Sequence, residues 1–189
     1  VSFSISRGEI LGIVGESGCG KSTLAKILVG SLPVSEGKMI LNGEDYTQLN
    51  GKEKRKFRRN IQMVFQDPLS SFSPRMKVGT YLMEARRNFD GISKAEGLKE
   101  AGRLLQEVGL PEEFVSRYPH ELSGGQLQRV AIARAISIQP KLLICDEATG
   151  ALDVSIQNQI AQLLVKLVEE KNIGCLFIGH DLALVRSVS

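Results

Sequence analysis

Short, fully apolar segments alternate with longer segments of helical periodicity along this chain. The apolar segments fall at residues 10–14, 61–65, 142–145 and 175–178, and their length predicts strands buried on both faces. Helical periodicity follows Lys21 and recurs at about residues 98–108, 124–138 and 156–167. Glycine or proline stands beyond the first three of these segments, where each predicted helix ends.

Strands near both ends of the chain enclose a helical middle. Residues 80–138 are mainly helical by pattern, whereas residues 68–80 are rich in Pro, Ser and Gly and are expected to form a loop. Residues 38–41 predict a short strand, with a turn at Asn42–Gly43. This order predicts a parallel α/β core at about residues 1–72 and 136–189, with a helical subdomain inserted at about residues 73–135.

Composition indicates one globular domain and excludes several kinds of partner. The 189 residues are 42% hydrophobic, 24% charged and only 5% aromatic, so the core is expected to be aliphatic. A net charge of +3 is too small to indicate a nucleic-acid partner. No apolar segment approaches the roughly 18 residues of a membrane helix, and no signal peptide opens the chain.

Two smaller features have ordinary structural interpretations. The basic cluster from Lys52 to Arg59 predicts a solvated helix face, with anionic headgroups or a partner protein as the alternatives. The three cysteines are odd in number and lack metal-ligand spacing. Cys145 and Cys175 lie in apolar segments and are expected to be buried, which is typical of a reducing, cytosolic compartment.

The clearest chemical motif follows the first predicted strand. Residues 15–22, GESGCGKS, match G-x-x-x-x-G-K-[ST] between a strand and a helix, a context that disfavours a chance glycine-rich turn. Backbone N–H groups and the helix dipole would bind phosphates, Lys21 can reach the β- and γ-phosphates, and the Ser22 hydroxyl can ligate Mg²⁺. The predicted nucleotide-binding residues are Gly15, Glu16, Ser17, Gly18, Cys19, Gly20, Lys21, Ser22 and Thr23.

Two acids follow the strand predicted at residues 142–145. Asp146 and Glu147 follow the apolar segment LLIC, and an acid at the carboxyl end of a parallel strand faces the ligand crevice. Asp146 suits a Mg²⁺-holding role, directly or through water, and Glu147 could polarise an attacking water. A surface acidic pair is the structural alternative, which the upstream phosphate motif disfavours.

A second glycine-rich helix start, LSGGQ at residues 122–126, is weak alone but together with the first motif resembles the signature of ABC ATPases. Gln66 in VFQDP resembles the Q-loop of that family, and Asp153 in ALD resembles its D-loop. His180 in IGHD resembles the switch histidine that contacts the γ-phosphate. A lone histidine after a strand is more often structural, but its place after one helix and one strand beyond Glu147 favours the functional interpretation.

The resemblance covers essentially the whole chain and implies a P-loop NTPase with a RecA-like parallel sheet, using ATP and Mg²⁺. It implies Glu147 as base, His180 as the γ-phosphate contact, and Ser22, Gln66 and Asp146 as metal ligands. In the family, two subunits pack head to tail, and each ATP lies between one P-loop and the other subunit's signature. The residues that this arrangement adds to the nucleotide site are Ser123, Gly124, Gly125, Gln126 and Asp153.

Residues 66–75, 118–126 and 151–157 look most like the dipeptide, oligopeptide and nickel importer ATPases of this family. That likeness implies transmembrane permease subunits, a second ATPase subunit and, indirectly, an extracytoplasmic substrate-binding protein, with this chain peripheral on the cytoplasmic face of the membrane. One rival is a soluble ABC ATPase of DNA repair or translation, whose usual coiled-coil or zinc insertion is not seen. Another is a regulatory module that binds ATP without hydrolysis.

Three positions depart from the family pattern. Ala148 stands where proline is usual, Gly150 replaces a serine, and Gly179 replaces a serine or threonine. Gly150 is expected to loosen the D-loop, because glycine adds backbone freedom. The chain also looks cut at both ends. The family's adenine-stacking aromatic is therefore expected upstream of residue 1, and Phe3 is expected to be a strand residue.

Overall fold

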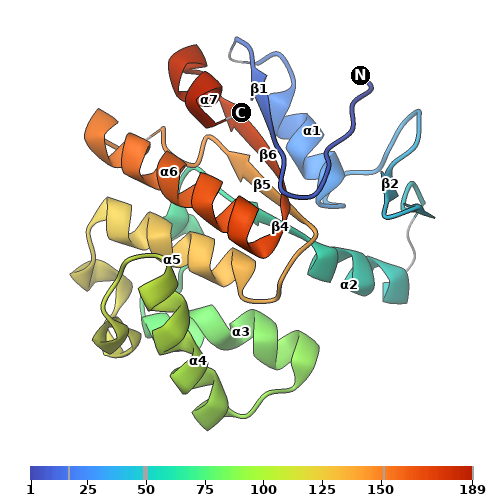
Figure 1. The fold of residues 1–189 in the computed structure, drawn as a ribbon. Helices are drawn as coiled ribbons and strands as arrows, with labels where there is room; N and C mark the ends of the chain where they lie inside the picture. Colours follow the sequence, from blue (N-terminus) through green and yellow to red (C-terminus); the bar gives the residue numbers. More distant parts are fainter. Residues whose placement is uncertain (17, 49–50, 151, 189) are drawn as a thin grey trace.

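A parallel sheet forms the centre of the molecule. The computed structural model describes residues 1–16, 18–48, 51–150 and 152–188, and within them four parallel strands form one sheet in the order β1, β6, β5, β4 (Figure 1). Their bounds are β1 Ile10–Val14, β4 Ile61–Val64, β5 Leu142–Asp146 and β6 Gly174–Gly179. Strand β6 is buried along its whole length, as expected for a sheet covered on both faces. The predicted α/β fold class and its four parallel strands are confirmed, but the expected burial is not met by β1, which is only half-buried and whose Val14 is 41% exposed.

Helices cover both faces of this sheet (Figure 1). They are α1 (Lys21–Leu28) and α2 (Gly51–Asn60) on one face, and α5 (Gly124–Ile136), α6 (Val154–Lys171) and α7 (Leu182–Val188) on the other. Successive strand residues point to opposite faces. Ile144 therefore packs in the cluster with Ala25 and Phe57, whereas Leu143 and Cys145 pack in the cluster with α5 and α6. Cys175 joins the second cluster, and the expected burial of both cysteines is confirmed.

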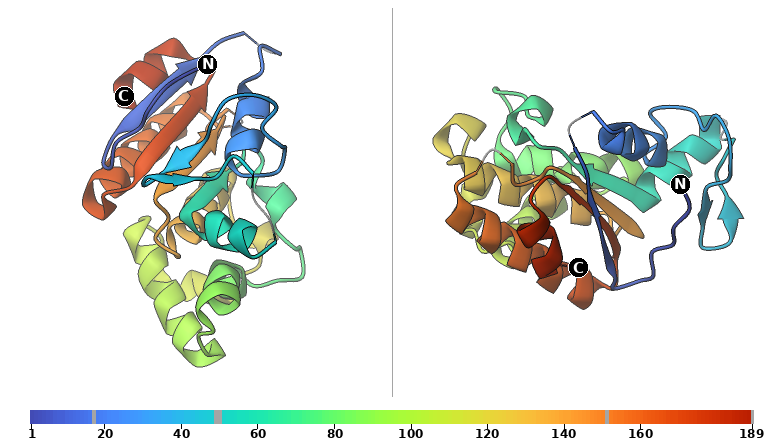
Figure 2. Two further views of the ribbon diagram at one scale, coloured as in Figure 1. Left: turned by 90° about the vertical axis from the view of Figure 1, so that its right-hand side faces the viewer. Right: turned by 90° about the horizontal axis from the view of Figure 1, so that it is seen from above.

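The middle of the chain folds into helices at the end of the molecule away from β1 and α7 (Figures 1 and 2). They are α3 (Val78–Asp90), α4 (Lys94–Glu107) and the 3₁₀ turns η1 (Pro68–Ser71), η2 (Glu112–Ser116) and η3 (Pro119–Glu121). Helix α4 begins with a capping box between Ser93 and Glu96, and Ala101 and Leu105 on its inner face are fully buried. The helical middle is confirmed, while its boundaries at about residues 73 and 135 stay a prediction.

The expected loop at residues 68–80 is only partly a loop. Asp67 caps the turn η1 by accepting a hydrogen bond from the Leu69 N–H at 3.0 Å, and α3 already begins at Val78. Val78 is fully buried, and a Cβ at Gly79 would lie 3.0 Å from the Val115 carbonyl oxygen. The glycine that argued for a loop therefore serves a close contact between α3 and η2.

A small hairpin stands beside helix α2. Strands β2 (Ile40–Leu41) and β3 (Glu44–Asp45) are antiparallel, and φ is positive at both Asn42 and Gly43, which confirms the predicted turn. Lys56 of α2 pairs with Glu44 at 3.0 Å. On the same helix, Arg59 pairs with Asp90 and Arg55 donates to the Asn88 carbonyl, both at the end of α3. The basic helix is largely exposed, as expected, but it also joins the hairpin to the helical region.

Two expectations at the ends of the chain were wrong or incomplete. Phe3 belongs to no strand and is 40% exposed. Helix α7 after His180 was not predicted, because its seven residues are too few for a periodic pattern to stand out. No helix in the described part of the chain has the length and apolar character needed to cross a membrane.

Candidate nucleotide-binding site

The loop between β1 and α1 has the open, left-handed shape that binds phosphates. Gly18 and Gly20 have φ values of 83° and 100°, and no atom lies within 4 Å of the place where a Cβ of either would stand. Such a backbone turns successive N–H groups toward one centre, and Gly20 leads directly into the N-terminus of α1. Gly15, Glu16, Cys19, Ser22 and Thr23 line this exposed segment. Ser17, also predicted here, lies outside the described residues.

Lys21 places a positive charge inside this loop. Its side chain is only 9% exposed, and its ammonium group donates to the Gly15 and Glu16 carbonyl oxygens at 2.7 and 2.8 Å. A Cβ at Gly15 would come within 2.8 Å of the Cys19 sulfur, so a larger residue there would displace the Cys19 side chain. The loop thus combines a buried cation with open backbone donors, a combination suited to an anion.

Ser22 and Asp146 form an oxygen pair beside the lysine. The Ser22 hydroxyl donates to Asp146 Oδ1 at 3.4 Å, across 124 positions of sequence. Burial raises the pKa of Asp146, as does repulsion from Glu147, while the bond from Ser22 and the charges of Lys21 and Lys26 oppose the rise. Hydroxyl and carboxylate oxygens are the hard donors that Mg²⁺ prefers, so this pair fits the implied ion.

Gln66 and His180 meet at Gly150, beside the Glu147 backbone. A Cβ at Gly150 would lie 3.4 Å from Gln66 Nε2 and 3.6 Å from His180 Cε1. Glu147 has a φ of 49°, an uncommon value for a non-glycine residue, and its N–H donates to the Ile178 carbonyl at 2.9 Å. Its own carbonyl accepts from the Gly150 N–H at 2.9 Å. Three predicted catalytic residues thus lie around one glycine, and strained backbone of this kind is concentrated at functional sites.

The predicted signature residues form the start of helix α5. Ser123 is the N-cap: its backbone N–H donates to Gln126 Oε1 at 3.0 Å, and its hydroxyl accepts from the Gln126 N–H at 3.4 Å. A Cβ at Gly125 would lie 2.8 Å from Ile156 Cγ2, so the helix start packs closely against α6. Asp153 is the N-cap of α6 and makes no side-chain cap bond. Signature and D-loop residues are therefore neighbours.

Two of the three departures from the family pattern have a packing explanation. Ala148 is 1% exposed, inside the core between β5 and α5. A Cβ at Gly179 would lie 2.9 Å from Val185 Cγ2, so glycine lets α7 pack closely on the end of β6. Gly150 lacks a left-handed φ, so the expected loosening of the D-loop is not visible in its backbone and stays a prediction.

Sequence reasoning missed Gln128 of α5. Its side chain is 1% exposed, and its amide donates to the Phe65 carbonyl oxygen at 3.4 Å, directly before Gln66. The available signal was a glutamine among the apolar positions Leu127, Val130 and Ala131 of a buried helix. A polar residue in that setting needs a partner, but the sequence does not say which one.

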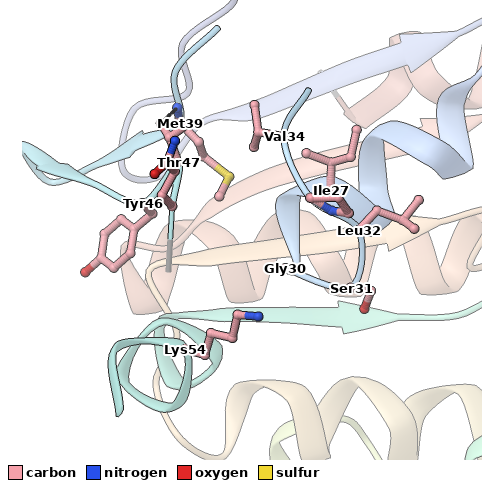
Figure 3. Close-up of a pocket in the computed structure, with 11 residues that line it drawn as sticks. Ile27, Gly30, Ser31, Leu32, Val34, Met39, Tyr46, Thr47 and Lys54 are labelled. Carbon is pink, nitrogen blue, oxygen red and sulfur yellow. Dashed lines mark hydrogen bonds between the residues drawn. The ribbon is translucent and has the colours of Figure 1, made fainter. Parts of the chain in front are cut away.

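Two hollows of the described residues lie away from the phosphate loop. One of about 270 Å³ lies between the end of α1, the hairpin and α2; Figure 3 shows Ile27 and Leu32 on one side of it, and Tyr46, Thr47 and Lys54 on the others. Another, of about 390 Å³, lies between α4 and the ends of α5 and α6. Neither includes a residue of 15–23. The phosphate loop is an open surface feature rather than a closed cavity. The candidate site is therefore identified by the polar groups of the loop and not by a cavity volume.

Comparisons with known proteins agree with this geometry. The chain is 46% identical to the oligopeptide transport ATP-binding protein OppF of Haemophilus influenzae, over all of this chain and 57% of OppF. It spans little more than half the length of the curated relatives it matches. Among solved structures, CbiO1 of Clostridium perfringens, described as part of the ABC transporter complex CbiONQ, superposes with a TM-score of 0.89 at 32% identity, over 100% of this chain and 73% of that one.

A further structure, the dimeric ATP-binding cassette MJ0796 bound to ADP and phosphate, superposes with a TM-score of 0.81 at 34% identity, over 97% of this chain and 80% of that one. These neighbours confirm the P-loop NTPase fold. The family model described as "ABC transporter" matches residues 1–150, which contain both glycine-rich helix starts, Gln66 and the acids that end β5. The chain therefore belongs to the ABC transporter family.

Proposed function

We propose that this chain is the ATP-binding and ATP-hydrolysing part of an ABC importer for peptides. One observation carries the proposal. The four parallel strands direct their carboxyl ends to one edge of the sheet, where the P-loop follows β1, Gln66 follows β4, Asp146 ends β5 and His180 follows β6. Ligands of open parallel sheets bind at that edge. The likeness to OppF supports oligopeptides as the cargo.

The side chains of this edge divide the work of phosphoryl transfer to water. Lys21 and the loop N–H groups would neutralise and orient the phosphates. Ser22, Asp146 and Gln66 would hold Mg²⁺, which when bound offsets negative charge on the phosphates. Glu147 would orient the attacking water and accept its proton, and His180 would contact the γ-phosphate. Catalysis of this kind rests mainly on position and charge, which suits a site built on rigid strand ends.

The signature residues would serve a second copy or a homologous subunit. Among the described residues, no hydrogen bond or ion pair joins residues 123–126 or Asp153 to the P-loop. That separation, together with the dimeric cassette MJ0796, supports a head-to-tail dimer in which Ser123, Gly124, Gly125 and Gln126 complete the partner's site. We further propose permease subunits as the membrane partners, with an extracytoplasmic binding protein delivering peptide, and a place for this chain on the cytoplasmic face.

The test is Mg²⁺-dependent ATP hydrolysis by the intact protein that carries this chain, beside its Glu147→Gln variant. We expect the variant to bind ATP as the wild type does and to hydrolyse it roughly a hundredfold more slowly, because the water loses its base. Glu170→Gln changes an exposed residue of α6 that pairs with Lys166, and it should leave turnover unchanged. Absence of hydrolysis in the wild type, with its membrane partners present, would refute the proposal and favour a regulatory ATP-binding module.

A further inference from the structure

Gln128 is a buried polar side chain in the helix that begins with the signature motif. It is 1% exposed, and its neighbours Leu127 and Val130 are buried and apolar. Burying an amide without a partner is costly, so its bond to the Phe65 carbonyl oxygen, at 3.4 Å, has an energetic reason. This bond joins two segments that are 63 positions apart in sequence.

The accepting carbonyl belongs to the peptide group that leads into Gln66. Strand β4 ends at Val64, whose pairing with Cys145 is the last of the ladder, so the sheet no longer fixes the next peptide. The Phe65 carbonyl and the Gln66 N–H lie in one rigid plane. A hydrogen bond that holds this carbonyl therefore orients the backbone from which the Gln66 side chain extends toward Gly150 and His180.

The donor is rigidly connected to the signature glycines. Gln128 follows Gly124 by four residues and Gly125 by three, so all three lie on one face of α5. At a rise of about 1.5 Å per residue, the side chain stands only about 6 Å along the helix from Gly124. A shift or rotation of α5 that moves the signature must therefore also move the amide that holds the Gln66 peptide.

We propose that Gln128 is a positioning residue that sets the place of Gln66 relative to the signature segment. The inference rests on the proposed function, because Gln66 matters here as a ligand of the Mg²⁺ that accompanies ATP. Gln128 itself touches neither nucleotide nor metal in this account. It acts through one peptide group. Helix α5 would thereby couple two parts of one subunit: the signature, which contacts the partner's nucleotide, and Gln66, which belongs to the subunit's own site.

The test replaces Gln128 with methionine, which keeps the length and volume of the side chain but removes the donor. In the intact protein, we expect the Mg²⁺ concentration for half-maximal binding of a fluorescent ATP analogue to rise about fivefold, the loss expected for one hydrogen bond. The control is Gln62→Met, near the start of β4, the strand that leads to Gln66. The Gln62 amide donates to the Ile61 carbonyl at 3.1 Å and to the Arg58 carbonyl. That variant should match the wild type.

A second background separates positioning from packing. If Gln128 acts through Gln66, the methionine change should have no further effect on the Mg²⁺ requirement in a Gln66→Ala protein, whereas independent packing would give additive effects. Additive effects, or a lowered melting temperature with an unchanged Mg²⁺ requirement, would overturn the inference. Should Gln128→Met fail to fold, Gln128→Leu, which is also apolar and lacks a donor, takes its place in the same comparison.

The binding measurement also separates this inference from the proposed function. Because it needs no turnover, a protein that binds the analogue with a Gln128-dependent Mg²⁺ requirement but never hydrolyses ATP would refute the function and support the positioning role. A protein that hydrolyses ATP and whose Gln128→Met variant matches the wild type would refute the positioning role alone. A wild type that binds no nucleotide would overturn both.

Discussion

Two helices of this protein begin at glycine-rich segments, and the two starts are built in opposite ways. Helix α1 begins after Gly20, in a left-handed conformation with no side-chain cap. Helix α5 begins after Ser123, whose backbone is extended and whose hydroxyl caps the helix in a reciprocal box with Gln126. The first start leaves its N–H groups open beside Lys21. The second satisfies one of its own N–H groups and packs Gly125 against Ile156 of α6.

The difference indicates which start can capture an anion alone. An open helix N-terminus with a buried cation is complete as a phosphate site. A self-capped start offers fewer free donors, and a phosphate would have to compete with the Ser123 hydroxyl for the Gln126 N–H. We therefore propose a primary phosphate site at α1 and a secondary contact at α5, which is useful only when another subunit brings its nucleotide to it.

Removing the Lys21 charge is expected to have the largest effect among the tests of this difference between the two helix starts. Lys21→Ala should weaken ATP binding roughly a hundredfold, because charge-assisted hydrogen bonds to phosphate are lost. The neutral N–H groups that remain bind phosphate more weakly than the ammonium group does. Titration with a fluorescent ATP analogue measures the loss. Lys26→Ala, which removes the same charge from the last turn of the same helix, should change affinity less than threefold. Equal losses would mean that net charge, not the loop's geometry, attracts the nucleotide.

Adding a methyl group tests the close packing at the second start. Gly125→Ala should lower the free energy of unfolding by about 1–3 kcal/mol, because its Cβ would meet the β-branched Ile156 at 2.8 Å. Gly124→Ala is the matched control, since its Cβ would stand at an ordinary 3.4 Å from Leu152. Denaturant unfolding of both variants checks the difference. If the two lose equal stability, the contact between α5 and α6 does not require glycine at residue 125.

The same two starts show what sequence could predict. The P-loop is contiguous, so the pattern at residues 15–22 specified the strand, the turn, the helix and the lysine together. Buried parallel strands were equally readable, because each is a short apolar segment. The signature residues were found by resemblance, but their packing on Ile156 and the self-made cap depend on α6 and on rotamers that no local pattern encodes.

Contacts across long sequence separations explain the misses. The sequence around Gln128 does not predict that its partner is the Phe65 carbonyl. The sequence around Gly179 likewise does not predict that Val185 is its neighbour across the turn to α7. Phe3 was expected to be a strand residue, yet in the structure it belongs to no strand. A pattern gives the propensity of a segment, whereas pairing needs a second segment in the right place.

The smallest expected effect concerns the acid that faces the first start. Burial raises the folded-state pKa of Asp146, so the folded protein holds this proton more tightly than the unfolded chain does. Its contribution to stability is therefore full below the ordinary aspartate pKa, and it is lost as the pH rises through the raised value. Asp146→Asn keeps the shape of the side chain but removes the free-energy cost of burying an ionised carboxylate. It should raise the melting temperature of the nucleotide-free protein slightly at pH 7, with the gain disappearing at about pH 3.5.

With Mg²⁺ and ATP bound, the Asp146→Asn variant should instead melt at a lower temperature than the wild type, because an amide binds Mg²⁺ more weakly than a carboxylate does. Thermal melts with and without Mg²⁺ and ATP therefore give opposite signs for the same substitution. Asp153→Asn, the N-cap of α6 beside the second start, should show no such sign reversal, since the first start alone would hold the metal. A reversal at both positions would mean that the two helix starts share the ion, and the distinction between a complete and an incomplete phosphate site would fail.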